Sequence, residues 1–350
     1  MIELSCQSFD LPLKHEFTIA RSSTSVQPTL VVQLGEEGAY GYGEATTNDY
    51  YGVTLENMTE ALDRVRPLLA DSTARDPESL LAEAAARLAD MPFALCALDC
   101  AVHDLWGKLA GEPLHRLWGL STEDAPLSDF TIGIDKVSVM VDKIREAPGW
   151  PIYKIKLGTP HDDLAIIRAL REETDAVFRV DANCGWTVSQ AIELSHALRD
   201  HGVEFIEQPL PADDVDGAAR LFAESALPVI ADESCVVESD VERCEGLFHG
   251  VNIKLVKCGG LAPARRMITT ARRLGLSVMA GCMTESTVGI SAIAQLLPLL
   301  DHVDMDGAEL ISKDIATGAR LDKGRCVFPT SPGLGVALID GPLTAQEPVS

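Results

Sequence analysis

The feature that most restricts the fold of this chain is a regular alternation in its middle part. Short segments rich in apolar and β-branched residues alternate with stretches in which Leu, Ile and Ala recur at helical spacing, with a period of about 25 residues. The strand-like segments are DFTIGI, YKIKLG, VFRVDAN, VEFIEQP, PVIADES, VNIKLVK, SVMAGCM and HVDMDGAEL. Strands that alternate with helices pair in parallel, and eight such units are typical of a (β/α)8 barrel. The sequence therefore predicts an α/β fold of the TIM-barrel type.

The chain divides into three parts in this interpretation. In the first part, TLVVQLGEEGAYGYGEA indicates two antiparallel strands joined by a Gly-containing turn, and Ala- and Leu-rich helices follow. We expect an N-terminal α+β domain over residues 1–120 and the barrel over residues 121–312. Residues 313–350 lack the strand–helix alternation, so we expect this C-terminal segment to pack back on the N-terminal domain.

Composition and charge narrow the class of protein. The formal net charge of −24 argues against binding to nucleic acid or to an anionic membrane surface. The start of the chain has no basic stretch followed by an apolar one, and no apolar run approaches about 20 residues. The nine cysteines include no CxxC pair, and Cys96 and Cys100 fall in an apolar helical stretch. These features predict a soluble protein of the reducing cytoplasm.

Acidic residues end three consecutive predicted strands. Asp181, Glu207 and Asp232 are separated by 207 − 181 = 26 and 232 − 207 = 25 residues, which is one strand–helix unit each. Active sites of such barrels lie at the carboxyl ends of the strands, so the three carboxylates should converge. Three anions repel one another unless a cation lies among them, and ligation by oxygen alone suits Mg²⁺. The alternative is that each acid only caps the helix that follows it.

Lysines flank these carboxylates on two strands that face each other. Lys154 and Lys156 in YKIKLG lie on one face of the second strand, because alternate side chains of a strand share a face. Lys254 and Lys257 lie on or just after the sixth strand, which is opposite the second in a ring of eight. A divalent cation and a second ammonium would both lower the pKa of such a lysine, which could then act as a general base. The alternative is a lysine exposed on the barrel rim.

Carboxylates and lysines together define a type of proton chemistry. A metal that binds a substrate carboxylate can stabilise the enediolate formed when the α-proton is removed. A single base would give elimination or isomerisation. Two bases on opposite sides of the carbon would let a proton leave one face and return to the other, which is racemisation or epimerisation.

The motifs KIK, DAN, IEQP, ADES and NIKLVKCGG on successive strands resemble the enolase superfamily, and within it the muconate-lactonizing-enzyme subgroup. A lysine base and a Mg²⁺-stabilised enediolate are known features of that superfamily. The resemblance extends over essentially the whole chain and implies that the N-terminal domain caps the barrel. It implies that the Mg²⁺ ligands are Asp181, Glu207 and Asp232. It also implies that Lys156 and Lys254 are the two acid–base residues and that Lys154 neighbours the substrate carboxylate.

The eighth strand narrows the choice within the subgroup. Asp304 and Asp306 share a face and are similar to the Asp-x-Asp pair that binds the substrate α-ammonium in dipeptide epimerases. The resemblance implies a dipeptide epimerase that inverts the C-terminal residue, with L-Ala-D/L-Glu, a cell-wall peptide fragment, as the expected substrate. N-acylamino-acid racemase, o-succinylbenzoate synthase and muconate cycloisomerase stay open as alternatives, although their substrates do not need this pair. A non-catalytic barrel that binds a metal or a carboxylate ligand is a further alternative.

Segments near the barrel mouth complete the candidate site. Arg21 in FTIARSSTSVQP resembles the residue of a mobile loop that binds an acidic side chain in Ala-Glu epimerases, and the alternative is a solvated loop arginine. Residues 50–52 could form a second closing loop, and Met283 in GCMTES is a candidate for substrate binding. Three charged residues receive no role from the sequence: Glu233, Lys257 and Glu285. The side-chain preference and a homo-oligomeric state stay open.

Overall fold

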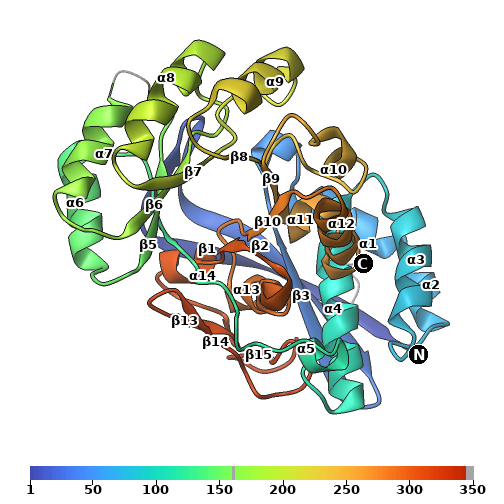
Figure 1. Ribbon diagram of the computed structural model, residues 1–350. Helices are drawn as coiled ribbons and strands as arrows, with labels where there is room; N and C mark the ends of the chain where they lie inside the picture. The colour runs from blue at the N-terminus through green and yellow to red at the C-terminus, as the bar shows by residue number, and fades with distance from the viewer. Residues whose placement is uncertain (160–161, 344–350) are drawn as a thin grey trace.

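A ring of eight parallel strands forms the centre of the protein (Figure 1). The computed structural model describes residues 1–159 and 162–343. The strands follow one another in chain order: β4 (Phe130–Ile132), β5 (Ile152–Lys156), β6 (Val177–Asp181), β7 (Val203–Glu207), β8 (Val229–Ala231), β9 (Gly250–Lys254), β10 (Ser277–Gly281) and β11 (His302–Asp304). A parallel bridge between Ser128 and Val303 joins the segment before β4 to β11, so the sheet closes on itself. The predicted barrel is confirmed, and each strand-like segment of the sequence forms one strand.

Helices follow the strands and cover the outside of the barrel (Figure 1). They are α6 (Val137–Glu146), α7 (Asp163–Arg171), α8 (Val188–Arg199), α9 (Val215–Glu224), α10 (Asp240–Arg243), α11 (Leu255–Cys258), α12 (Leu261–Arg273), α13 (Thr287–Ala294) and α14 (Gly307–Leu310). Their amphipathic sequences explain this packing, since Ile166, Ile167 and Leu170 of α7 are buried while Arg168 is exposed. None of the helices in the described part of the chain is long and apolar enough to cross a membrane.

The N-terminal domain is a three-stranded antiparallel sheet packed on helices. Its elements are β1 (Glu3–Ile19), β2 (Ser22–Glu36), β3 (Ala39–Thr46), η1 (Asp49–Tyr51), α1 (Leu55–Asp63), α2 (Arg66–Ala70), α3 (Pro77–Arg87), α4 (Pro92–Ala110) and α5 (Leu114–Leu117). Glycines allow β3 to approach α4 closely, because a Cβ on Gly41 or Gly43 would lie 2.3 Å or 2.0 Å from a backbone oxygen of that helix. Glu37 and Gly38 have positive φ angles of 52° and 80°, as a tight hairpin turn between β2 and β3 requires.

The β1–β2 hairpin reaches over the barrel mouth, and we call residues 12–27 the lid. Thr18 O accepts a hydrogen bond from Ile134 N at 2.8 Å, just beyond β4. Pro12 O accepts a hydrogen bond from Ser312 N at 2.7 Å, just beyond α14. The closing loop expected from the sequence is therefore a β-hairpin, in which residues 20 and 21 alone lie outside the two strands.

The described part of the C-terminal segment, residues 313–343, contains four short strands and contacts the N-terminal domain. The strands are β12 (Ala316–Thr317), β13 (Arg320–Asp322), β14 (Arg325–Val327) and β15 (Ala337–Leu338). Leu334 N donates a hydrogen bond to Asp104 Oδ1 at 2.7 Å, and Leu343 N donates one to Gln33 Oε1 at 2.6 Å. The domain boundaries at residues 120 and 312 stay a prediction.

Candidate active site

The three acidic strand ends meet on one side of the barrel mouth. Asp181 of β6 pairs in register with Glu207 of β7, and Asp232 directly follows β8. One carboxylate oxygen of each residue lies within 4.8 Å of the corresponding oxygens of the other two, and all three side chains are buried. The structure thus brings together the carboxylates whose regular spacing suggested that they converge.

This group of carboxylates fits a divalent cation with oxygen ligands. Glu207 Oε1 accepts a hydrogen bond from Asn252 Nδ2 at 2.8 Å, whereas its buried Oε2 accepts none from the described residues. Lys154 Nζ lies 2.7 Å from that Oε2, but without the geometry of a hydrogen bond. Burial and the neighbouring Asp181 raise the pKa of Glu207 to about 7, against the opposite effect of Lys154. A cation among the three carboxylates would reduce this cost of burying like charges.

Lys154 and Lys156 project from one face of β5 into the barrel at different depths. Lys154 is fully buried, and its Nζ lies 2.7 Å from Glu207, 2.8 Å from Asp304 and 3.3 Å from Asp181. Burial lowers the pKa of Lys154, but these carboxylates outweigh burial and hold the pKa well above its usual value. Lys156 Nζ lies 2.6 Å from Asp181 Oδ2 and borders a cavity. Lys154 is therefore a fixed cation beneath the site, while Lys156 is in a position to reach a substrate.

Lys254 enters the same space from β9, on the opposite side of the barrel. Its Nζ lies 2.9 Å from Asp232 Oδ2. Burial lowers the pKa of Lys254, Asp232 raises it, and the net shift is upward. The sequence predicted that a second ammonium would lower the pKa of such a lysine. Lys154 does lower the pKa of Lys254, but its effect is smaller than the increase that Asp232 causes.

A cavity of about 150 Å³ lies between the barrel mouth and the lid. Lys156 and Lys254 border it from opposite strands of the barrel, and Asp232 borders it from the carboxylate group. Phe17 and Arg21 of the lid cover the other side. Two lysines on opposite sides of one cavity are the arrangement that two-sided proton transfer needs.

Asp304 and Asp306 form a second acidic group on this cavity, at the end of β11. Asp304 Oδ2 accepts a hydrogen bond from Lys154 Nζ at 2.8 Å, while its buried Oδ1 accepts none from the described residues. Asp306 Oδ2 accepts a hydrogen bond from Thr131 N at 2.6 Å. Burial opposes ionisation of Asp304, but Lys154 holds its pKa below the usual range, whereas burial and Asp304 raise the pKa of Asp306 well above it. A cationic group of a substrate would find an ionised carboxylate with a free oxygen here.

Cys282 lies beside this pair, with its sulfur within 4.8 Å of an oxygen of each aspartate. Burial and the two aspartates raise the pKa of the Cys282 thiol well above its usual value, so the sulfur stays protonated. Metals bind the thiolate rather than the thiol. The group around Cys282 therefore fits a metal less well than the three carboxylates of β6 to β8.

Arg21, at the tip of the lid, contacts the barrel beside the carboxylate group. Its Nη1 donates to Glu233 Oε1 at 2.7 Å and to Asn183 O at 3.4 Å. Its guanidinium carbon lies 4.3 Å from the centre of the Tyr50 ring. Sequence reasoning missed this role of Glu233, and no local signal reveals it, because the two partners are 212 residues apart. Arg21 thus reaches the site but is already paired with one carboxylate.

Met283 and Tyr51 also border the cavity, as candidates from the sequence. Asn48 Nδ2 lies 3.8 Å from the sulfur of Met283. Glu285 lies behind the cavity, where its Oε1 accepts a hydrogen bond from Met283 N at 2.9 Å. Burial and the neighbouring Glu44 raise the pKa of Glu285 to about 8. Glu285 therefore supports the loop that carries Met283.

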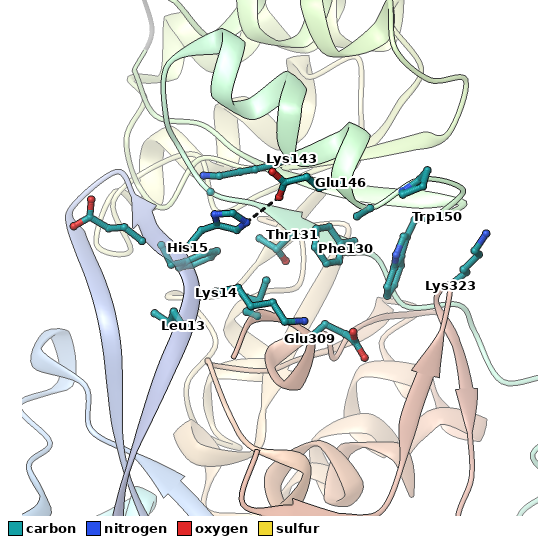
Figure 2. Close-up of a pocket in the computed structure, with 16 residues that line it drawn as sticks. Leu13, Lys14, His15, Phe130, Thr131, Lys143, Glu146, Trp150, Glu309 and Lys323 are labelled. Atoms are coloured by element: carbon teal, nitrogen blue, oxygen red, sulfur yellow. Dashed lines mark hydrogen bonds and ion pairs between the residues drawn. The ribbon is translucent and has the colours of Figure 1, made fainter. Parts of the chain in front are cut away.

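A larger cavity of about 360 Å³ lies beside the lid, between β4 and α14 (Figure 2). Aromatic rings line it, including Phe130 and Trp150, and His15 Nε2 contacts Glu146 Oε2 at 2.9 Å on its wall. Thr131 borders both cavities. The strand-end carboxylates and the lysines of β5 and β9 do not line the larger cavity, so the candidate chemistry belongs to the smaller one.

The fold and the site together define a class of (β/α)8 barrels that carry carboxylates and lysines at their strand ends beneath an N-terminal domain. Residues 1–119 match the family model of the mandelate racemase / muconate lactonizing enzyme N-terminal domain. Residues 137–341 match the enolase C-terminal domain-like model. The chain belongs to the enolase superfamily, which confirms the resemblance of its strand motifs.

Several relatives are epimerases. The L-Ala-D/L-amino acid epimerase of Flavobacterium johnsoniae is 51% identical over 338 residues, which cover 97% of this chain and 100% of that protein. The L-Ala-D/L-Glu epimerase of Bacteroides thetaiotaomicron is 40% identical over 333 residues, which cover 95% and 86%. A solved dipeptide epimerase of Methylococcus capsulatus, complexed with Mg and the dipeptide L-Arg-D-Lys, is 34% identical with a TM-score of 0.88. That match covers 95% of this chain and 98% of the other.

Proposed function

We propose that this protein is a Mg²⁺-dependent dipeptide epimerase, an isomerase that inverts the α-carbon of the C-terminal residue of a dipeptide. The observation behind the proposal is that Lys156 and Lys254 border one cavity from opposite strands, together with Asp304 and Asp306. The epimerase relatives match nearly the whole chain and support the same activity.

Asp304 and Asp306 would bind the α-ammonium of the N-terminal residue. Asp304 Oδ1 is buried and accepts no hydrogen bond from the described residues, so a substrate ammonium would supply the missing donor. A hydrogen bond to a charged group contributes about 1.5–3 kcal/mol. This contact would fix which end of the dipeptide lies at β11, and it would place the C-terminal α-carbon between the two lysines.

Asp181, Glu207 and Asp232 would hold Mg²⁺ through their carboxylate oxygens. When bound, the ion supplies positive charge to the substrate carboxylate and so makes the α-proton more acidic. Lys154 stays protonated beneath these carboxylates and offsets part of their mutual repulsion, because its Nζ contacts two of them.

Lys156 and Lys254 would transfer the proton between the two faces of the α-carbon. In one direction a neutral lysine removes the proton from its face while the other, protonated, lysine donates a proton to the opposite face. In the reverse direction the two lysines exchange roles. The lid covers the cavity and would limit the access of water during the transfer.

We further propose L-Ala-D/L-Glu, a cell-wall peptide fragment, as a substrate, and cytoplasmic metabolism of such peptides as the setting. Arg21 would bind the glutamate side chain, because its guanidinium has donors beyond the one that contacts Glu233. Met283 would line the same part of the cavity. Since Glu233 already balances the charge of Arg21, we expect a moderate preference for acidic side chains.

The alternative activities fit the site less well. Substrates of N-acylamino-acid racemase, o-succinylbenzoate synthase and muconate cycloisomerase have no free α-ammonium, so they would leave Asp304 Oδ1 without a donor. A barrel that only binds a metal would gain nothing from a lysine on each side of the cavity, and burying charged groups is costly.

Hydrogen–deuterium exchange tests the proposal. The full chain is incubated with L-Ala-L-Glu and other free dipeptides in D2O with Mg²⁺, and the products are separated by chirality and analysed by mass spectrometry. We expect the D-epimer of the C-terminal residue with deuterium at its α-carbon. N-acetyl-L-Ala-L-Glu, which lacks the ammonium, is the matched control and should react far more slowly. The proposal fails if no free dipeptide exchanges its α-proton.

A further inference from the structure

Lys257 is a buried lysine that the proposed reaction does not use. It lies in α11, three residues after Lys254, and its side chain is 1% exposed. Its Nζ donates to Asp232 Oδ1 at 2.5 Å, to Asp232 O at 2.5 Å and to Cys235 O at 2.9 Å. An ammonium has three donors, so these contacts occupy all of them. Lys257 therefore has no donor left for a substrate, and it does not border the cavity.

The two carboxylate oxygens of Asp232 contact different lysines. Oδ1 accepts a hydrogen bond from Lys257, which does not line the cavity, whereas Oδ2 lies 2.9 Å from the Nζ of Lys254, which does. Because Lys257 also binds the backbone oxygens of Asp232 and Cys235, it fixes the turn after β8 together with the carboxylate. The side chain of Asp232 can then present Oδ2 in one orientation.

The other two carboxylates of the group follow the same arrangement with neutral donors. Asp181 Oδ1 accepts a hydrogen bond from Asn183 N at 2.9 Å, and Glu207 Oε1 accepts one from Asn252 Nδ2 at 2.8 Å. In each residue a hydrogen-bond donor fixes one oxygen, while the other oxygen lies close to a lysine. At Asp232, the fixing donor is a buried ammonium.

We propose that Lys257 is a positioning residue for metal binding, which holds Asp232 so that Oδ2 is the ligand atom. The inference rests on the metal site of the proposed function. Groups that orient the ligands of a metal typically change its affinity by about 10- to 100-fold. Fixing the carboxylate in advance also removes the entropic cost of ordering it when the cation binds.

Electrostatic repulsion alone predicts the opposite change in metal affinity when Lys257 is removed, and this makes the inference testable. A positive charge near a cation site repels the cation, so removing that charge should tighten binding. Positioning by Lys257 predicts that removing it weakens binding. The direction of the change therefore decides between the two effects.

The test measures Mg²⁺ binding by titration calorimetry, and Mn²⁺ binding by electron paramagnetic resonance, in the full chain. We expect Lys257→Met to weaken binding by about 10- to 100-fold. Lys257→Gln, which retains a polar donor without the charge, should fall between Lys257→Met and the unsubstituted protein. Lys254→Met removes the same charge from the other oxygen of Asp232 and is the matched control; its metal affinity should be unchanged or higher.

Thermal unfolding with and without Mg²⁺ separates positioning from a general loss of stability. A purely structural role would lower Tm equally in both conditions, whereas positioning also reduces the gain in Tm that Mg²⁺ provides. If Lys257→Met does not fold, Lys257→Gln decides by the same measurements. Binding that is as tight as in the unsubstituted protein, or tighter, in the folded variants would overturn the inference alone. Failure of the unsubstituted protein to bind Mg²⁺ would overturn the proposed metal site as well.

Discussion

Two acidic groups lie on opposite sides of the barrel ring, and the protein neutralises them differently. Each of Asp181, Glu207 and Asp232 has one oxygen fixed by a hydrogen bond and the other close to a lysine. In the pair at β11, Asp304 contacts a lysine, but Asp306 is bound by the neutral Thr131.

The difference shows what kind of cation each group suits. Three carboxylates, each held by a hydrogen bond to one oxygen and each with an oxygen within 4.8 Å of the others, suit a small ion that needs several ligands in a set geometry. A pair with one unfixed oxygen suits an ammonium, which brings its own hydrogen-bond donors. Lys154 connects the two groups, since its Nζ contacts Asp181, Glu207 and Asp304.

The largest expected effect comes from the two lysines that face the space between these groups. Lys156→Ala and Lys254→Ala should each reduce epimerisation by about 10³-fold or more, because each removes one of the two proposed proton-transfer groups. Each variant should still exchange the α-proton of one substrate epimer with D2O. Chiral separation and proton NMR in D2O measure the two activities. Normal epimerisation by the Lys254 variant would show that the two-base assignment is wrong.

The next largest effect is a loss of stability when Lys154, whose ammonium contacts both acidic groups, is replaced. Lys154→Met should reduce the free energy of unfolding by about 3–5 kcal/mol, because it leaves buried carboxylates without their partner. Urea unfolding followed by circular dichroism measures this change. Lys136→Met is the control on the exposed surface and should stay within about 0.5 kcal/mol of the unsubstituted protein. Equal effects of the two substitutions would argue against a shared buried cation.

A pair of matched substitutions tests whether the groups bind different cations. Asp304→Asn should lower kcat/KM for free dipeptides by about 10- to 100-fold, which is the loss of a hydrogen bond to a charged group. It should leave Mg²⁺ affinity nearly unchanged. Asp181→Asn should lose Mg²⁺ binding in calorimetry and, with it, the Mg²⁺-dependent activity, so Mg²⁺ affinity is the measurement that distinguishes the two variants. If both variants lose Mg²⁺ affinity to the same extent, the two acidic groups do not bind different cations.

The smallest expected effect concerns the side-chain preference. Arg21→Met should lower kcat/KM for L-Ala-L-Glu relative to L-Ala-L-Ala by about fivefold, because partly exposed ion pairs contribute up to about 1 kcal/mol. The ratio of the two substrates cancels any general change in the lid. An unchanged ratio would mean that Arg21 does not contact the C-terminal side chain.

The barrel and the positions of its strand-end carboxylates could be predicted from the sequence, because they follow from the regular strand–helix repeat. A repeat of one strand and one helix places Asp181, Glu207 and Asp232 at equivalent strand ends without any knowledge of long-range contacts. The face shared by Lys154 and Lys156 follows from the alternation of side chains along a strand in the same way.

The roles within each motif could not be predicted, since they depend on depth and on distant partners. Residues two positions apart in a strand are separated by about 6.6 Å along the strand axis. This separation places Lys154 among the carboxylates and Lys156 at the cavity. The contact between Arg21 and Glu233 spans 212 residues, and only the folded hairpin brings them together. The role proposed for Lys257 depends on the contacts of its ammonium with Asp232 and Cys235 in the turn after β8, which the sequence does not reveal.

The contacts that anchor the lid and the first sheet also set the order of events during synthesis. The bond between Pro12 and Ser312 spans 300 residues, and the bond between Gln33 and Leu343 spans 310. Neither can form until the later residue of the pair has been made, and such distant pairings slow folding because they close very long loops. The contact between Pro12 of β1 and Ser312 therefore cannot hold the lid over the cavity until β11 has been made. Until then the lysines and carboxylates around the cavity lack the cover that the lid provides.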